Sequence, residues 1–125
     1  MSMTPGPVIV VDDDAAVRQS LKFVLELEGL NVRLYEGADE LLAESELPDN
    51  GCLVVDYYMP RMNGVELIDR LRRRLVKLPA ILITARVTDD MRRRAARSGF
   101  RQVIEKPLED GTLVDSIRGA LTSPG

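Results

Sequence analysis

The chain of 125 residues contains no histidine and only one cysteine, Cys52. Without histidine it can build neither a Ser-His-Asp nor a Cys-His catalytic group, and a transition metal would find no imidazole ligand. The chain also cannot carry a phosphohistidine of its own. A single cysteine is typical of the reducing cytoplasm, and Cys52, which opens an apolar run, is expected to pack as a small core residue.

Long apolar segments and a strong excess of one charge are also missing. No stretch approaches the roughly 20 apolar residues of a membrane span, and the N-terminus with its proline and glycine does not look like a signal peptide. The net charge of -3 argues against a dedicated nucleic-acid binder. We therefore expect a cytoplasmic protein that contacts neither membranes nor DNA.

Apolar, β-branched runs alternate with segments of helical periodicity along the chain. The expected strands cover residues 7–12, 31–35, 52–56, 80–85 and 102–105, and the expected helices cover residues 14–28, 38–45, 65–74, 89–98 and 110–121. Five strand–helix units in alternation favour a parallel sheet with helices on both faces, because right-handed crossovers place them there. The expected organisation is one domain over residues 1–125, with a core at about 7–121.

Acidic residues follow two of the expected strands at their carboxyl ends. The run Val-Ile-Val-Val leads into Asp12, Asp13 and Asp14, and the run Leu-Val-Val leads into Asp56. If these strands are neighbours, Asp12, Asp13 and Asp56 converge at the edge where open α/β sheets bind ligands. At about 4 Å and an effective dielectric constant of about 20, each pair of carboxylates would repel by roughly 4 kcal/mol. The cluster therefore requires a proton, a cation or a nearby lysine, and carboxylate oxygens alone suit a hard cation, magnesium above all.

Two further polar residues follow expected strands at the same edge. Thr84 ends the run Ile-Leu-Ile-Thr, and Lys106 follows the run Val-Ile-Glu. Taken singly, each has an ordinary explanation, as a strand threonine or a solvated lysine. Together with the acids, they place chemically compatible groups from four elements at one edge of the sheet.

The combination of Asp12-Asp13, Asp56, Thr84-Ala85 and Glu105-Lys106-Pro107 resembles the receiver domain of two-component response regulators. Residues 63–67 and 104–108 look like receivers of the nitrogen-fixation regulator type. The resemblance runs from about residue 8 to 121 and implies a flavodoxin-like, doubly wound (βα)5 fold, a three-layer sandwich with strand order 2-1-3-4-5.

The resemblance also implies a chemistry for these residues. Asp56 would accept a phosphoryl group from a sensor histidine kinase and become an acyl phosphate. Thr84 and Lys106 would each contact a phosphoryl oxygen, and the Lys106-Pro107 bond would be cis. Such a chain catalyses only its own phosphorylation and dephosphorylation and is not classed as an enzyme.

A magnesium ion is the cofactor that the resemblance implies. Asp13 would bind the ion directly and Asp12 mainly through water, while Asp56 and the main-chain carbonyl of Tyr58 would be further ligands. Asp14 occupies a third acidic position, where capping of the following helix and an electrostatic role are both open.

Two uses of such a receiver remain open. One is a switch that binds a downstream protein when phosphorylated, and the other is a shuttle or sink that passes phosphoryl groups between kinases and phosphotransfer proteins. No effector domain is expected, since only Thr-Ser-Pro-Gly follow the last helix. The basic runs at residues 70–74 and 92–97 favour solvated helix faces, the alternative being a docking surface for an acidic partner or a second copy in a homodimer.

Two other classes of protein fit the sequence poorly. A flavin or nucleotide module needs a phosphate loop rich in glycine or hydroxyl groups, whereas here the first strand runs into three acids. A phosphatase of the haloacid dehalogenase type needs a second acid two residues after the nucleophile, and Tyr58 stands at that position after Asp56.

The sequence departs from most receivers at Val103, where an aromatic residue is usual. Because a β-branched side chain has little χ1 freedom, we expect the signal to travel through the loop after Thr84 and the helix at 89–98. Tyr58 and Arg86, two residues beyond Asp56 and Thr84, are expected to shield an acyl phosphate from water. Phe23 is either a contact for the kinase or a half-buried core residue.

Overall fold

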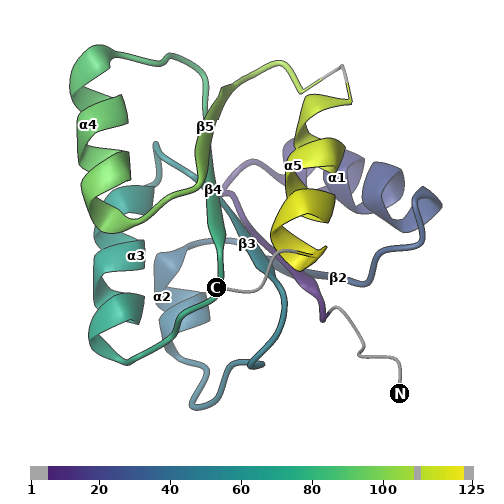
Figure 1. Ribbon diagram of the computed structural model, residues 1–125, viewed down its shortest axis with the longest axis horizontal. Helices are drawn as coiled ribbons and strands as arrows, with labels where there is room; N and C mark the ends of the chain where they lie inside the picture. Colours follow the sequence, from purple (N-terminus) through teal and green to yellow (C-terminus); the bar gives the residue numbers. More distant parts are fainter. Residues whose placement is uncertain (1–5, 109–110, 123–125) are drawn as a thin grey trace.

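The computed structural model describes residues 6–108 and 111–122. Five parallel strands form one sheet in the order β2-β1-β3-β4-β5, and helices cover both of its faces (Figure 1). The strands are β1 (Val8–Val11), β2 (Val32–Tyr35), β3 (Cys52–Asp56), β4 (Ala80–Thr84) and β5 (Gln102–Glu105). The expected flavodoxin-like architecture and strand order are confirmed.

Two helices pack on one face of the sheet and three on the other. Figure 1 shows α1 and α5 together on one side, with α2, α3 and α4 opposite. The helices are α1 (Ala15–Leu27), α2 (Ala38–Leu42), α3 (Gly64–Arg73), α4 (Asp89–Ser98) and α5 (Thr112–Thr122). The predicted start of the last helix at Asp110 lies outside the described residues. Within those residues, no helix has the length and apolar character needed to cross a bilayer.

The second helix is shorter than predicted. The helical pattern extends to Ser45, but α2 ends at Leu42. Arg74, from the end of α3, donates from Nη1 to the main-chain carbonyl of Leu42 at 3.1 Å and from Nη2 to that of Glu44 at 2.7 Å. A carbonyl bound by a guanidinium from another element does not need a further helical turn to satisfy it, so the prediction to residue 45 was wrong.

The three central strands are buried along their whole length, as expected for strands covered on both faces. Their side chains alternate between two apolar clusters. One cluster lies against α2, α3 and α4 and includes Ile9, Val55, Leu67, Leu71 and Leu82. The other includes Val10, Leu25, Val54, Ile83 and Ile117, on the side of α1 and α5. Cys52 belongs to this second cluster and is fully buried, which raises the pKa of its thiol to about 12 and leaves it unreactive.

The turn from β1 into α1 is fixed by Asp14. Its carboxylate accepts hydrogen bonds from the backbone N–H groups of Ala16 and Val17, at 2.9 and 3.4 Å. Asp14 therefore caps α1, which settles its structural role and leaves the two preceding acids to the edge of the sheet.

Candidate metal centre

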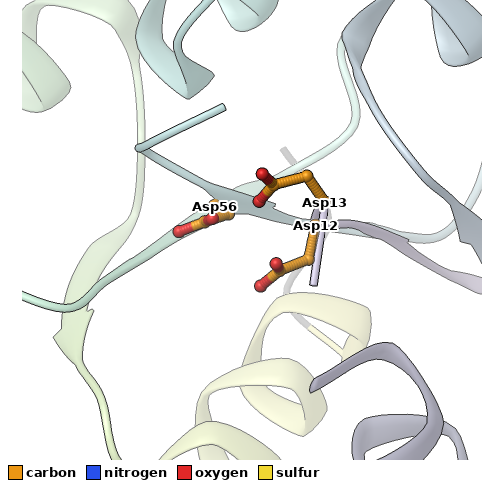
Figure 2. A group of neighbouring side chains, drawn as sticks. All are labelled: Asp12, Asp13 and Asp56. Atoms are coloured by element: carbon orange, nitrogen blue, oxygen red, sulfur yellow. The ribbon is translucent and has the colours of Figure 1, made fainter. Parts of the chain in front are cut away.

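The register of the sheet brings the acids of β1 and β3 together. Val11 pairs with Val55, so Asp12 and Asp56 lie side by side at the same level of neighbouring strands. Oxygen atoms of Asp12, Asp13 and Asp56 all lie within 4.8 Å of one another. Figure 2 shows Asp12 and Asp13 on either side of the end of β1, with Asp56 beside them. The structure thus produces the predicted acidic cluster.

Asp12 is fully buried and has a hydrogen-bond donor for each carboxylate oxygen. Its Oδ1 accepts from the backbone N–H of Asp14 at 2.9 Å, and its Oδ2 accepts from Nζ of Lys106 at 3.0 Å. These two donors satisfy an ionised carboxylate that has no access to solvent.

Lys106 enters the cluster from the end of β5. Its Nζ also lies 3.4 Å from Oδ1 of Asp56, so that one ammonium bridges two carboxylates. Burial lowers the pKa of Lys106, but its hydrogen bond to Asp12 and its attraction to Asp56 and Asp12 outweigh burial and raise the pKa overall. The Lys106-Pro107 peptide bond is cis, as the resemblance implied.

The surroundings of Asp56 disfavour its ionised form. Burial and repulsion from Asp12 raise the pKa of Asp56 to about 6, even though Lys106 acts in the opposite direction. One ammonium therefore does not neutralise the site. An uncompensated, oxygen-only set of donors suits a small, hard divalent cation, and Asp12, Asp13 and Asp56 are placed to hold one.

Thr84 ends β4 and is fully buried. Its hydroxyl donates to the main-chain carbonyl of Arg86 at 3.0 Å and lies 3.3 Å from the N–H of the same residue. The backbone N–H of Lys106 donates to the Thr84 carbonyl at 2.8 Å. The hydroxyl is thus engaged by the loop between β4 and α4, which ties that loop to the edge of the sheet.

The loop after Asp56 is held close to the strand end by Gly64. Its N–H donates to the carbonyl of Tyr57 at 3.1 Å. A Cβ atom at Gly64 would meet the Asp56 carbonyl oxygen at 2.5 Å, so that only glycine fits here. Tyr58 lies in this loop with its side chain half-exposed, and its ring contacts that of Tyr57 edge-on.

The sequence did not indicate the contacts of two residues near the site, Arg18 and Glu105. Arg18 donates from Nη1 to the main-chain carbonyl of Asp12 at 2.7 Å. Glu105 accepts, through Oε2, a hydrogen bond from the N–H of Val87 in the loop after β4 at 3.1 Å. Arg18 belongs to no motif, and the motif that contains Glu105 does not indicate this role, because each side chain acts on a main-chain group of another segment. The helical periodicity of α1 could at most have placed Arg18 on the face that looks toward the sheet.

The arginines of the two basic runs are exposed, with the exception of Arg72. Arg72 donates to the main-chain carbonyls of Val76 and Leu78, and burial lowers its pKa. Arg94 lies 3.3 Å, through Nη1, from the phenol oxygen of Tyr57. The interpretation of these runs as solvated faces is therefore wrong for Arg72, whereas Arg94 is exposed as that interpretation expects.

The first helix exposes apolar side chains. Phe23 is 66% exposed and Leu27 is 70% exposed, so the half-buried core position considered for Phe23 is ruled out. Val24, next to them, lines a groove of about 530 Å³ between α1 and α5.

Comparison with known proteins agrees with this fold and site. Residues 8–118 match the model of the response regulator receiver domain. Since the match covers most of the chain, the protein belongs to this family, whose members are phosphoacceptors in two-component signalling and interact with histidine kinases.

The relatives show which receivers this chain is similar to. It is 38% identical over 118 residues to the transcriptional regulatory protein FixJ of Rhizobium meliloti (strain 1021), a match that covers 94% of this chain and 58% of FixJ. An uncharacterized 14.6 kDa protein of Leptolyngbya boryana is 44% identical over 112 residues, which cover 86% of this chain and 83% of that protein. The crystal structure of FixJ-N superimposes with a TM-score of 0.88 at 36% identity and covers 98% of both chains. The chain thus spans little more than half the length of the curated FixJ that it matches.

Proposed function

We propose that this protein is a magnesium-dependent phosphoacceptor that a sensor histidine kinase phosphorylates on Asp56, and that it signals through contacts with other proteins. The observation that carries the proposal is the meeting of three carboxylates and one ammonium at the carboxyl end of the sheet. The cytoplasm is the location that we propose, and the autocatalytic loss of the phosphoryl group is part of the same proposal.

In this proposal Asp56 is the nucleophile. Its carboxylate oxygen attacks the phosphorus atom and forms the P–O bond of an acyl phosphate, while the bond from phosphorus to the donor nitrogen breaks and the histidine of the kinase leaves. A divalent cation held by Asp12, Asp13, Asp56 and the Tyr58 carbonyl would supply the positive charge that offsets the charge of the phosphoryl oxygens.

Lys106 and Thr84 contact the phosphoryl oxygens in this proposal, Lys106 during the transfer as well as after it. Lys106 already contacts Asp56 at 3.4 Å and would turn toward a phosphoryl oxygen. The Thr84 hydroxyl would leave the carbonyl of Arg86 and donate to another phosphoryl oxygen. Because the loop after β4 would lose this hydrogen bond, we propose that the loop and α4 carry the signal, as the β-branched Val103 cannot reproduce the swing of an aromatic ring.

A single comparison tests phosphorylation. The chain is incubated with acetyl phosphate, with and without magnesium, and its mass is measured. We expect the wild type to gain the mass of one phosphoryl group only when magnesium is present. The Asp56→Asn variant should gain no mass. Asp49→Asn, at an exposed acid away from the cluster, is the matched control and should gain the same mass. A phosphorylated Asp56→Asn protein would contradict the assignment.

The path of the signal is tested by amide chemical shifts with a beryllofluoride mimic bound. We expect shifts at residues 85–88 and along α4, and unchanged shifts there would refute this path.

The switch and the shuttle are separated by kinetics, because a long-lived acyl phosphate supports the switch. Rapid return of the phosphoryl group to a histidine donor would support the shuttle or sink instead. Sedimentation of the phosphorylated chain would detect a homodimer.

A further inference from the structure

The main chain of Asp12 is held by a side chain from the following helix. Arg18 lies on α1, and its Nη1 donates to the Asp12 carbonyl at 2.7 Å, the shortest contact that Asp12 makes among those described. The Arg18 side chain is only 12% exposed. A guanidinium in this position is therefore part of the structure behind the acidic cluster and not a surface group.

The carbonyl of Asp12 forms the peptide that leads into Asp13. Asp13 is exposed, so that its side chain is not fixed by packing. The direction in which it leaves the main chain depends on the plane of this peptide. A donor that fixes the carbonyl oxygen therefore helps to decide whether the Asp13 carboxylate points toward Asp56.

Among the described contacts of Asp12, Arg18 is the one that holds this carbonyl oxygen, while the N–H of Asp14 closes an Asx turn around the same peptide through the Asp12 carboxylate. The N–H of Asp12 donates to the Tyr35 carbonyl at 3.2 Å, on the amino side of the residue. Its carboxylate is held by the N–H of Asp14 and by Lys106. Lys106 is expected to move to a phosphoryl oxygen during the reaction, so its contact with Asp12 changes. The hydrogen bond from Arg18 does not involve the phosphoryl group and can remain in place.

A purely structural role does not explain why the guanidinium of Arg18 is buried here. Its ion-pair partner, Glu36, lies 3.8 Å away and is 70% exposed, which makes the pair weak. Removing a guanidinium from water carries a large desolvation cost that one such pair does not offset. The nearby carboxylate cluster provides the stronger reason for a cation behind Asp12.

We propose that Arg18 is a positioning residue of the metal centre, which holds the peptide between Asp12 and Asp13 so that both carboxylates face one divalent cation. This inference rests on the proposed function of the site. It makes a prediction of definite sign, because electrostatics alone would act in the opposite direction. Removing a positive charge should strengthen the binding of another cation, whereas losing the hydrogen bond should weaken it.

The test is a titration of the unphosphorylated protein with Mg²⁺, followed by tyrosine fluorescence and by calorimetry. The chain has three tyrosines and no tryptophan, and two of the tyrosines directly follow Asp56. Arg18→Met keeps the length of the side chain and removes the donor. We expect it to weaken Mg²⁺ binding about tenfold to a hundredfold, the range for residues that orient metal ligands. Arg18→Lys, which retains a donor, should recover part of the affinity.

Arg33→Gln is the matched control, since it removes the same charge from an exposed position on β2, and its Mg²⁺ affinity should not fall. Thermal unfolding in EDTA shows whether each variant is folded. If Arg18→Met does not fold, Arg18→Lys takes its place in the Mg²⁺ titration. A folded variant that binds Mg²⁺ as tightly as the wild type, or more tightly, overturns the inference even if its melting temperature falls. Failure of the wild type itself to bind Mg²⁺ overturns the proposed function as well, so that the two failures are distinguishable.

Discussion

Lys106 forms its shorter ion pair with Asp12, at 3.0 Å, and its longer one with Asp56, at 3.4 Å. The ammonium therefore neutralises part of the negative charge that a metal ion would compensate. It also lies close to Asp56, the proposed phosphoacceptor. Asp12, which is fully buried, holds the lysine in place while leaving Asp56 the more weakly paired of the two carboxylates. In such a site the carboxylate of Asp56 is only weakly neutralised, so that it stays reactive as a nucleophile but is still repelled by Asp12.

Replacing Lys106 by methionine should separate its two roles. With the ammonium removed, the cluster is more negative and should bind Mg²⁺ several-fold more tightly. Phosphorylation by acetyl phosphate should nevertheless become slower, because the phosphoryl oxygens lose a cationic donor. Calorimetry and the rate of mass gain measure the two effects. Lys77→Met, at an exposed lysine, should change neither, and a Lys106→Met protein with wild-type affinity and rate would contradict both roles.

The raised pKa of Asp56 predicts how stability depends on pH. Its pKa in the folded protein, about 6, lies above its ordinary value of 3.8. The folded state therefore binds this proton more tightly than the unfolded chain, so that the stabilisation is complete below about pH 4 and is lost as the pH rises through about 6. In EDTA at pH 7, Asp56→Asn should increase the free energy of unfolding by about 1 to 3 kcal/mol.

Urea unfolding at pH 4 and at pH 7 measures this difference. The gain from Asp56→Asn should shrink at the lower pH, and added Mg²⁺ should reduce it at pH 7 by stabilising the wild type alone. A variant that is less stable than the wild type at pH 7 in EDTA would show that the carboxylate is not destabilising there.

Tyr58 and Arg86 are placed to control the access of water to an acyl phosphate. Both side chains are exposed, and each residue lies two positions beyond the end of a strand, Tyr58 after β3 and Arg86 after β4. Replacing both with alanine should increase the rate of dephosphorylation several-fold, as measured by the decay of the phosphorylated mass. Arg101→Ala, at an exposed arginine before β5, should leave the lifetime unchanged. An unaltered lifetime in the double variant would refute shielding.

The residue after the C-cap of α3 predicts a stabilising substitution. Leu75 adopts a φ of 64°, the left-handed region that favours glycine, and its side chain is 78% exposed. Leu75→Gly removes a strain of about 1 to 2 kcal/mol and increases the entropy of the unfolded chain. The net gain should be about 0.5 to 1 kcal/mol in the free energy of unfolding. Gly99→Ala, at a φ of 91° after α4, is the reciprocal control and should destabilise.

The family resemblance and the parallel sheet could be predicted from the sequence because both depend on short, local patterns of residues. A β-branched run without polar alternation identifies a strand buried on both faces, and an acid directly after it must lie at the carboxyl edge of a parallel sheet. On this basis Asp12, Asp13 and Asp56 could be placed at one edge of the sheet, and the strand order that the resemblance implies made their strands neighbours. The end of α2 could not be predicted in this way, because Arg74 reaches its carbonyl across 32 residues of sequence.

The sequence by itself determined the order of strands and helices, the buried central strands and the set of groups at one edge of the sheet, because main-chain periodicity is a local property. Only the tertiary structure decided that Lys106 pairs more closely with Asp12, 94 residues away, that Arg18 binds the Asp12 carbonyl, and that the Thr84 hydroxyl contacts Arg86. These contacts depend on how helices and loops pack against the sheet, and a side-chain hydrogen bond requires its two atoms within about 3.2 Å. No spacing along the chain fixes a separation to that accuracy.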